Sequence, residues 1–385
     1  MSKKTKPRLL VIEPQCSMAS PSMKGFVKSL PVLSQHFSLE LWAVETDDDP
    51  PVDGVVLFPK WLCVPIIGTY LFALCALARW VWLHTVLGRQ KPDLTYAVAW
   101  CYPMPDVWLI QFSAWDWDKR LRVLGFRDFR DAYYWLANRL SMATGNLLMK
   151  LWPARLYLSA SEAVAADLLH LRSDLNVHVL PNSYDPSRFN PQVRQLFRVS
   201  TRKILGYGDD DVVFLFASLG HHRRKGFDLA AQAMALLHQR QPDAKMLLVG
   251  GTTTTLARLR RQLDSYAPSW PQWLTFTGMV SDIEKYYAAA DALLFPSHSE
   301  AFSLVEVEAG ACGLPLFLTR HHGSEMIMEA GKNGLWLEFD SVNIAEVLET
   351  FVTKSWQPTS VPLKHAMDSD TYAQRLTQEL LQALP

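Results

Sequence analysis

The chain has 385 residues, of which 49% are apolar, and its 38 Lys and Arg residues balance its 38 Asp and Glu residues. This composition is that of an ordinary globular protein and excludes a disordered or fibrous chain. The balanced charge argues against a general nucleic-acid binder, which carries an excess of basic residues. The length corresponds to roughly two domains of ~150 residues, and a chain of this size can bury a core without disulfide or metal staples.

Cysteine usage and the N-terminal residues bear on the compartment. The number of cysteines is five, which is odd, and no two of them form a Cys-x-x-Cys motif. This pattern argues against a disulfide framework and favours a reducing compartment. The basic residues 1–8 run directly into the apolar residues 9–12, a run too short for the core of a signal peptide. We therefore expect a cytoplasmic protein.

Residues 61–78 carry no charged side chain, and a run of that length reaches the threshold for a spanning helix. Pro65 and Gly68 interrupt its first third, however, and Arg79 ends it, so a span is the least favoured interpretation. Residues 61–83 are then either a buried helix of the first domain or a helix in peripheral contact with the inner face of the membrane. The second alternative rests on three flanking tryptophans, which are typical of membrane interfaces: Trp61, Trp80 and Trp82.

The first half of the chain alternates short apolar runs with helical stretches. We expect strands at residues 8–13, 39–44, 55–58, 93–99, 107–112, 156–160 and 177–180. We expect helices at residues 25–36 and 61–83 and from Glu162 onward. Repeated strand–helix units predict a parallel sheet with helices on both faces.

The same alternation restarts after a turn-rich break at residues 181–185. Expected strands cover residues 212–217, 245–249, 274–277, 292–295 and 316–319. Expected helices cover residues 227–240, 254–266, 283–290, 303–312 and 371–384. The fold class predicted is α/β, with two facing Rossmann-like domains, each a doubly wound parallel sheet.

The most informative segment is 295–315, where a buried strand ends at Pro296 and a helix begins near Ser303. The N-terminus of that helix presents unpaired N–H groups and a positive dipole end, which suit a phosphate. Glu300 lies just before the helix and Glu308 lies inside it, so the two carboxylates can face one ligand. Glu306 is about 200° around the helix from Glu308 and is expected to face elsewhere.

Glu300, seven intervening residues, Glu308 and the following Ala-x-Ala-x-Gly-x-Pro resemble the signature of retaining GT-B glycosyltransferases of family 4. Further segments are similar to that family in the expected order: 158–161, 181–189, 217–228, 247–251, 276–280, 286–297 and 319–334. The resemblance covers roughly residues 155–340 and is weak over the first 150.

The resemblance implies an acceptor-binding domain at residues 1–187 and a donor-binding domain at 188–365. A final helix within 366–385 would pack back on the first domain. It implies a retaining glycosyltransferase that moves a sugar from a nucleotide-diphosphate sugar to a glycan or lipid-linked acceptor. No cofactor, metal or nucleic acid is expected. Two alternatives stay open: a 2-epimerase-like enzyme on the same fold, and an inactive scaffold that binds nucleotides or glycans.

The resemblance also assigns roles to residues. Lys225 would bind the donor diphosphate with help from Arg224, and Glu300 would touch the transferred sugar; these three are the expected catalytic residues. Glu308 would accept hydrogen bonds from the ribose. The other expected donor-binding residues would contribute backbone near the base, the sugar and the phosphates: Gly25, Gly278, Val280, Phe302, Ser303 and Leu304.

This chain departs from the family pattern in both halves. Ala301 and Ser303 replace two glycines that allow close approach of the backbone. The loop after the first strand keeps only Gly25, and Gln111 stands where the family often has a histidine. On the acceptor side we select Gln111 and Trp115, with residues 115–118 expected on a loop. The adjacent pairs at 221–222 and 321–322 lack a carboxylate at ligand spacing, so these histidines do not predict a metal site.

Overall fold

The computed structural model describes residues 6–20, 23–63, 67–111, 114–125, 129–359, 361 and 363–385. The chain forms two compact units. Residues 1–183 and 367–385 make up the first unit, and residues 184–366 make up the second. The changeovers lie a few residues from the boundaries at 187 and 365 that the sequence predicts.

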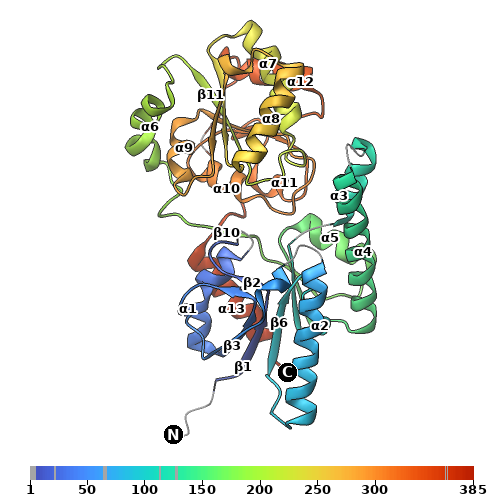
Figure 1. Cartoon of the computed structure of the whole chain (residues 1–385). Coiled ribbons are helices and arrows are strands. Elements are labelled where there is room, and N and C mark those ends of the chain that lie inside the picture. Colours follow the sequence, from blue (N-terminus) through green and yellow to red (C-terminus); the bar gives the residue numbers. More distant parts are fainter. Residues whose placement is uncertain are drawn as a thin grey trace. The chain divides into compact units, whose positions relative to one another are not determined.

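The first unit is built on a seven-stranded parallel sheet. Its order is β5 (Gly54–Leu57), β3 (Ser38–Ala43), β1 (Arg8–Ile12), β6 (Leu94–Val98), β7 (Val107–Ile110), β8 (Leu156–Ser159) and β9 (Val177–Val179). Its helices are α1 (Lys24–His36), α2 (Ile67–Val81), α3 (Ala114–Leu124), α4 (Phe129–Leu151), α5 (Glu162–Leu171) and α13 (Ser369–Gln382) (Figure 1). A 3-10 turn at Lys60–Cys63 precedes α2, and a π-helical turn at Trp82–Val86 extends it.

The C-terminal helix α13 completes the core of the first unit. It packs along α1, and Tyr372, Leu376 and Leu380 are buried among the side chains of α1 and the sheet. Gly25 lies near the start of α1, where an added Cβ would come within 2.9 Å of Ser183 Oγ and 3.4 Å of the Tyr372 ring. The small residue at position 25 therefore lets α1 approach these neighbours closely.

The second unit has a six-stranded parallel sheet. Its order is β13 (Leu274–Gly278), β12 (Ala244–Val249), β11 (Val212–Ala217), β14 (Ala292–Phe295), β15 (Leu316–Thr319) and β16 (Gly334–Leu337). Its helices are α6 (Gln192–Leu205), α7 (Phe227–Arg240), α8 (Thr253–Tyr266), α9 (Ile283–Ala289), α10 (Leu304–Ala311), α11 (Ser324–Ile327) and α12 (Ser341–Val352). Short two-stranded pairings join β2 (Gln15–Cys16) to β4 (Glu45–Thr46) and β10 (Ser183–Tyr184) to β17 (Met367–Asp368).

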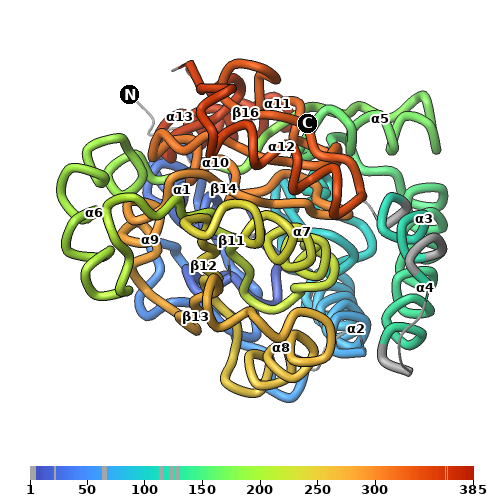
Figure 2. Tube along the Cα trace, turned by 90° about the horizontal axis from the view of Figure 1, so that it is seen from above, coloured from blue at the N-terminus to red at the C-terminus, as the bar shows by residue number. Residues whose placement is uncertain are grey.

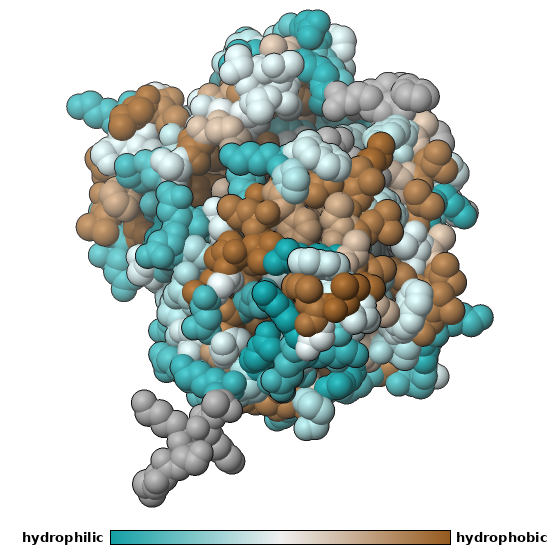
Figure 3. Space-filling view, turned by 60° about the horizontal axis from the view of Figure 1, so that its bottom comes forward, coloured by the Kyte–Doolittle hydropathy of each residue, from teal (hydrophilic) through white to brown (hydrophobic). Residues whose placement is uncertain are grey.

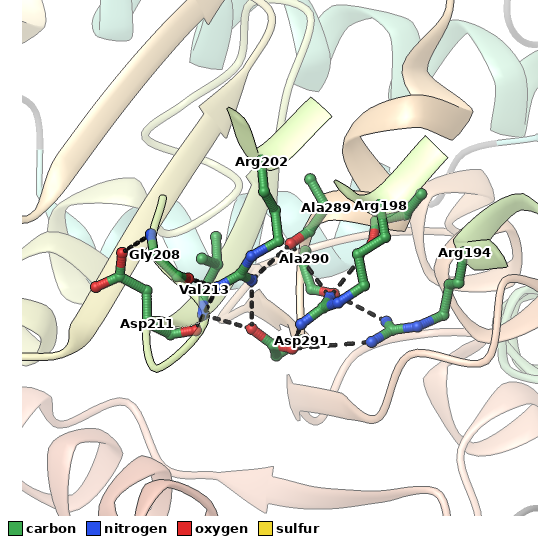
Figure 4. Close-up of polar contacts among 10 residues, drawn as sticks. Arg194, Arg198, Arg202, Gly208, Asp211, Val213, Ala289, Ala290 and Asp291 are labelled. Atoms are coloured by element: carbon green, nitrogen blue, oxygen red, sulfur yellow. Dashed lines mark hydrogen bonds and ion pairs between the residues drawn. The ribbon is translucent and has the colours of Figure 1, made fainter. Parts of the chain in front are cut away.

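Charged side chains hold α6 against α9 at one side of the second unit (Figure 2). Arg194, Arg198 and Arg202 follow one another at four-residue spacing on one face of α6 and reach the end of α9 (Figure 4). Arg198 donates to Asp291 Oδ1 at 2.6 Å, and Arg202 lies 3.2 Å from Oδ2. All three arginines also donate to the Ala290 or Ala289 carbonyl, which the end of α9 leaves without a helical partner.

Five helices in the described part of the chain were not among the predicted elements: α3, α4, α6, α11 and α12. The exposed face of α4 is rich in apolar residues, so its pattern lacks a clear polar side. The acceptor-side loop predicted at residues 115–118 is wrong, because Asp116, Trp117 and Asp118 lie in α3. Asp116 stands in the first turn of that helix, where a carboxylate is favoured by the dipole.

The arginine cluster on α6 predicts a specific loss of stability. Asp291→Ala removes the carboxylate that Arg198 and Arg202 share, and the Arg202 side chain is only 6% exposed. We expect the free energy of unfolding of the second unit to fall by about 3 kcal/mol, because a buried charge loses its partner. Urea denaturation followed by tryptophan fluorescence measures this change.

The matched control is Asp282→Ala, which breaks the exposed pair with Lys285 at 42% and 38% exposure. It should cost less than about 1 kcal/mol. Equal losses in the two variants would show that the cluster does not hold α6 in place.

Candidate functional site

The candidate site lies where the sheet of the second unit changes its direction of growth. The chain builds β11, β12 and β13 toward one edge and then returns to add β14, β15 and β16 on the other side of β11. The carboxyl ends of β11 and β14 therefore diverge into loops at neighbouring positions, which is where open α/β sheets bind ligands. These loops are residues 218–226 and 296–303, the two segments that the sequence singles out.

Lys225 and Glu300 meet at this point although they come from different loops. Lys225 Nζ donates a hydrogen bond to Glu300 Oε1, and Ser297 Oγ donates to the same oxygen at 2.8 Å. Both side chains are largely buried, at 16% exposure for Lys225 and 8% for Glu300. The structure thus brings together the two residues that the resemblance assigns to diphosphate and sugar.

Backbone contacts fix the two loops to each other. The His298 N–H donates to the Arg224 carbonyl at 2.8 Å, and Thr319 Oγ1 donates to the Ser297 carbonyl at 2.6 Å. Gly226 has φ +78°, and an added Cβ would lie 1.9 Å from the Pro296 carbonyl oxygen. Only glycine fits there without strain, so the start of α7 can press directly on the end of β14.

The charges around Glu300 stabilise its ionised form. Burial by itself raises the pKa of this carboxyl, but the charges of Lys225, Arg224 and His321 and the hydrogen bond from Lys225 lower it to about 2. Burial lowers the pKa of Lys225, and the Glu300 carboxylate opposes that shift. Glu300 is therefore an ionised carboxylate with positively charged groups on several sides.

Glu308 occupies a different position on α10. Tyr287 OH, which is fully buried at the end of α9, donates to Glu308 Oε2 at 3.0 Å. The carboxylate itself is half-buried. Tyr287, which orients Glu308, lies in the segment 286–297 that resembles the family but was not singled out from the sequence.

Gly25 lies in the first unit, near the start of α1, whereas the other predicted donor-binding residues lie in the second unit. The remaining donor-side residues lie at the same edge of the second sheet. Ser303 occupies the N-cap position of α10 without a capping hydrogen bond from its side chain, and Leu304 begins the helix. Phe302 is buried just before it. Gly278 ends β13 with φ +76°, and its carbonyl accepts a hydrogen bond from the Gly250 N–H at 2.8 Å. Val280 follows two residues later and is half-buried.

Several buried polar groups near this edge have no hydrogen-bond partner within the described part of the chain. They share a position in the loops after β11 and β14 or at the start of α10: Ser218 Oγ, both ring nitrogens of His222, Ser299 Oγ and Ser303 Oγ. Buried polar groups are nearly always satisfied in native proteins, so such a cluster calls for a further partner. Hydroxyl and ring N–H donors suit a ligand rich in acceptor oxygens.

Glu306 and His321 form a second buried pair next to the first. Their side chains are fully buried, and His321 Nε2 lies 3.0 Å from Glu306 Oε1. Burial lowers the pKa of His321, but the Glu306 carboxylate outweighs it and the net shift is upward. As expected, Glu306 faces away from Glu308. It points into the interior, where it pairs with His321. One feature of the sequence could have indicated this buried pair: a glutamate stands at a position on α10 that packs against β15.

Residues on the acceptor side belong to the first unit. Gln111 follows β7, and its Nε2 donates to Asn182 Oδ1 at 3.4 Å. Trp115 lies in the first turn of α3, but its side chain is outside the described part of the structure. Sequence reasoning missed Glu13, which follows β1 at the direction change between β1 and β6. Burial raises the pKa of Glu13 to about 7. Carboxyl groups with a strongly shifted pKa are found most often at functional sites.

The described residues contain no group of three His, Cys, Asp or Glu side chains arranged to hold a metal ion. The four cysteines with described side chains, Cys16, Cys75, Cys101 and Cys312, are free thiols.

Residues 210–354 match the model of the family described as glycosyl transferases group 1. The mannosylfructose-phosphate synthase of Agrobacterium fabrum is 30% identical over 179 residues, which are 44% of this chain and 38% of that protein. The D-inositol 3-phosphate glycosyltransferase of Pseudarthrobacter chlorophenolicus is 29% identical over 194 residues, 48% of this chain and 44% of that protein. The matches thus span less than half the length of these curated relatives.

A solved structure extends the likeness to the whole chain. The structure of Anabaena HepE in complex with UDP and glucose superposes with a TM-score of 0.66 at 18% identity, covering 97% of this chain and 99% of that one. At this identity the likeness shows the fold. The prediction of a GT-B fold with two Rossmann-like domains is confirmed, and so is the resemblance to group 1 glycosyltransferases.

The buried pair of His321 and Glu306 predicts a pH-dependent stability. Because the folded pKa of His321 is raised, the pair stabilises the fold fully below the ordinary value of 6.5 and loses that contribution as pH rises through the raised value. The double variant His321→Leu with Glu306→Leu lacks the ion pair and therefore its pH-dependent contribution to stability. Urea denaturation should therefore show the stability of the wild type, relative to the double variant, falling as pH rises above 6.5 and through the raised pKa of His321.

The single variant His321→Leu is the control for the pair itself. It leaves Glu306 buried without its partner and should lose about 3 kcal/mol at pH 6. A difference between wild type and double variant that stayed constant or increased with pH would contradict the assigned pair.

Proposed function

We propose that this chain, whose residues 210–354 match the group 1 glycosyl transferases, is a retaining, metal-independent glycosyltransferase. It would transfer a sugar from a nucleotide-diphosphate sugar to a glycan or lipid-linked acceptor. The observation that carries the proposal is the meeting of Lys225 and Glu300 at the direction change between β11 and β14, with Glu308 on the helix that follows. UDP and glucose are bound in the HepE structure, which supports a nucleotide sugar as donor.

The charges of the second unit suit a diphosphate leaving group. In the reaction the bond between the anomeric carbon and the diphosphate oxygen breaks, and its electron pair stays on that oxygen. Lys225, with Arg224 nearby, supplies fixed positive charge there, and the backbone N–H groups at the start of α10 add their dipole. Preorganised donors of this kind stabilise developing negative charge without a metal.

Glu300 has two roles in this proposal. It keeps Lys225 charged and positioned inside a largely buried site, since burial alone would favour the neutral amine. When a diphosphate enters, Lys225 exchanges a carboxylate partner for phosphate oxygens, and Glu300 becomes able to accept hydrogen bonds from the sugar. Ser218, Ser299 and Ser303 supply hydroxyl groups whose present lack of partners a phosphate or sugar would relieve.

The first unit would receive the acceptor. Gln111 and Trp115 remain the proposed acceptor-side residues, and Glu13 joins them because its pKa near 7 allows it to accept a proton at neutral pH. Gly25 remains proposed as a donor-side backbone position. We also propose that the protein is cytoplasmic and that its residues 61–83 make peripheral contact with the inner face of the membrane.

Replacing Lys225 should weaken donor binding strongly. A charge-assisted hydrogen bond to phosphate is worth about 1.5–3 kcal/mol, so Lys225→Ala should lower the affinity for UDP, GDP or ADP, whichever binds, by roughly 10–150-fold. Titration calorimetry measures this change. Arg224→Ala should have a larger effect than Arg223→Ala, and thermal melting controls for folding. Unchanged affinity in a folded Lys225→Ala would refute the diphosphate site.

The two glutamates should affect nucleotide binding differently. Glu300→Gln frees Lys225 from its carboxylate partner, so a nucleoside diphosphate, which lacks the sugar, should bind as well as to wild type or more tightly. Glu308→Gln replaces the charged acceptor for the ribose with a neutral amide that keeps one acceptor oxygen, and should bind the same nucleotide roughly tenfold more weakly. With a nucleotide sugar, Glu300→Gln should mainly lower kcat, and Glu308→Gln should mainly raise KM.

Tyr287→Phe is the matched control for the ribose contact, because it keeps the Glu308 carboxylate and removes only the hydrogen bond that orients it. Its effect on nucleotide affinity should be smaller than that of Glu308→Gln. If Glu300→Gln abolished nucleoside diphosphate binding and Glu308→Gln left it intact, the roles assigned to the two glutamates would be reversed.

A further inference from the structure

Helix α2 exposes an apolar stripe on the side away from the sheet. The helical run from Ile67 to Val86 is long and apolar enough to cross a membrane by length and composition, yet only 22% of its most apolar window is buried. Its exposed residues recur at helical spacing, each 37–62% exposed: Ile67, Leu71, Leu74, Val81 and Trp82. Of the two alternatives left open for residues 61–83, a buried helix does not fit, because only one face of α2 packs on the sheet.

A second helix, α4, carries a stripe of the same kind. Its exposed apolar residues recur at steps of three, four or seven, which keep them on one side of the helix, and each is 42–63% exposed: Tyr133, Leu136, Leu140, Leu147 and Leu151. Singly exposed apolar residues are normal on a protein surface, but two stripes on neighbouring helices form a patch that indicates an interaction. Figure 3, in which the lower part of Figure 1 comes forward, shows apolar side chains gathered across the middle of that face.

The two stripes face the same side of the first unit. The helices lie next to each other, since Tyr70 OH on α2 is 3.4 Å from Ser141 Oγ and 3.5 Å from Thr144 Oγ1 on α4. Each connects to a parallel strand, so α2 and α4 run in the same direction (Figure 1). At 100° per residue, the stripe of α2 lies about 70° after Tyr70, and that of α4 about 90° before Ser141 and Thr144. In a parallel pair, these opposite rotations turn both stripes to one side.

Positive charge predominates around these helices, although Asp131 stands in the first turn of α4. Residues 54–92 and 132–161 contain no Asp or Glu at all. The same two segments contain seven basic residues: Lys60, Arg79, Arg89, Lys91, Arg139, Lys150 and Arg155. In a chain with no net charge this is a local excess of positive charge, and it complements an anionic lipid surface. Exposed Trp61 and Trp82 have the amphipathic rings that favour the interfacial region of a bilayer.

The inner face of α2 is committed to the fold. Phe72 is fully buried and its ring meets Phe58 at 5.1 Å between centroids, and the Arg79 guanidinium lies 5.3 Å from the Trp42 ring. A helix that left the sheet to cross a bilayer would expose this face and carry Arg79 into the lipid, which is costly. Binding in the plane of the membrane keeps these contacts.

We propose that the exposed sides of α2 and α4 together form one docking surface, on which the first unit lies flat against an anionic phospholipid bilayer. This docking surface extends beyond the contact proposed for residues 61–83, because half of it comes from α4. Docking on it does not depend on the transferase activity. The stripes enter the interfacial region, and the exposed basic side chains meet the lipid headgroups: Lys60, Arg89, Lys91 and Lys150. Neither helix spans the bilayer.

The test is co-flotation of the full chain with vesicles of phosphatidylcholine alone and with vesicles containing phosphatidylglycerol. We expect binding to the anionic vesicles, and weakening by salt, which screens the charges. Leu140→Glu with Leu147→Glu on α4 should lower partitioning at least tenfold, as should Leu74→Glu on α2. The matched control is Val199→Glu, an 82% exposed apolar position on α6, which should bind vesicles like the wild type.

Nucleotide affinity and thermal melting of the same variants separate loss of docking from loss of folding and from failure of the proposed function. Full vesicle binding by the α4 variant would overturn the two-helix surface and leave α2 as the only contact. Protein that resists carbonate extraction would indicate a span instead. A wild-type dimer that the α4 variant converts to a monomer, without vesicle binding, would mean that the patch pairs two copies of this chain.

Discussion

The candidate site depends on an ion pair between residues that lie 75 positions apart in the sequence, Lys225 and Glu300. Neither charge is stable alone in so buried a place, because a charge taken out of water without a partner is very unfavourable. The sheet solves this by placing the carboxyl ends of β11 and β14 side by side, so that each loop delivers one member of the pair. The close approach of Gly226 to Pro296 follows from the same constraint, since any side chain there would push the two loops apart.

The site is also left partly unsatisfied. Ser218, Ser299, Ser303 and His222 bury polar atoms without partners in the described part of the chain, and such groups cost stability in a low-dielectric interior. The chain therefore carries, in one place, both paired charges and unpaired hydrogen-bonding groups. This combination is expected of a surface preorganised for a polar ligand, whose oxygens supply the missing partners and compete for Lys225.

Much of the second unit could be predicted from the sequence, because its strands are continuous apolar runs and its loops carry a distinctive pattern of glutamates and glycines. The pairing of Lys225 with Glu300 could not be, since the distance between two loops depends on strand order, which local patterns do not contain. Helix α6 was not predicted from the sequence for another reason. It turns Arg194, Arg198 and Arg202 toward the fold and leaves Leu196, Val199 and Ile204 exposed at 69–83%, the reverse of the usual amphipathic pattern.

The return of the C-terminal helix to the first unit has a consequence for how the protein is made. The ribosome releases the strands of the first unit early, but α13, with Tyr372, Leu376 and Leu380, emerges only after the whole second unit. During synthesis the groove on α1 and its sheet stays uncovered, while the second unit, being contiguous in sequence, can fold on its own. Domains generally fold as units in order of emergence. Here the domain that begins first is finished last, and the apolar side chains that α13 covers stay exposed until the end of synthesis.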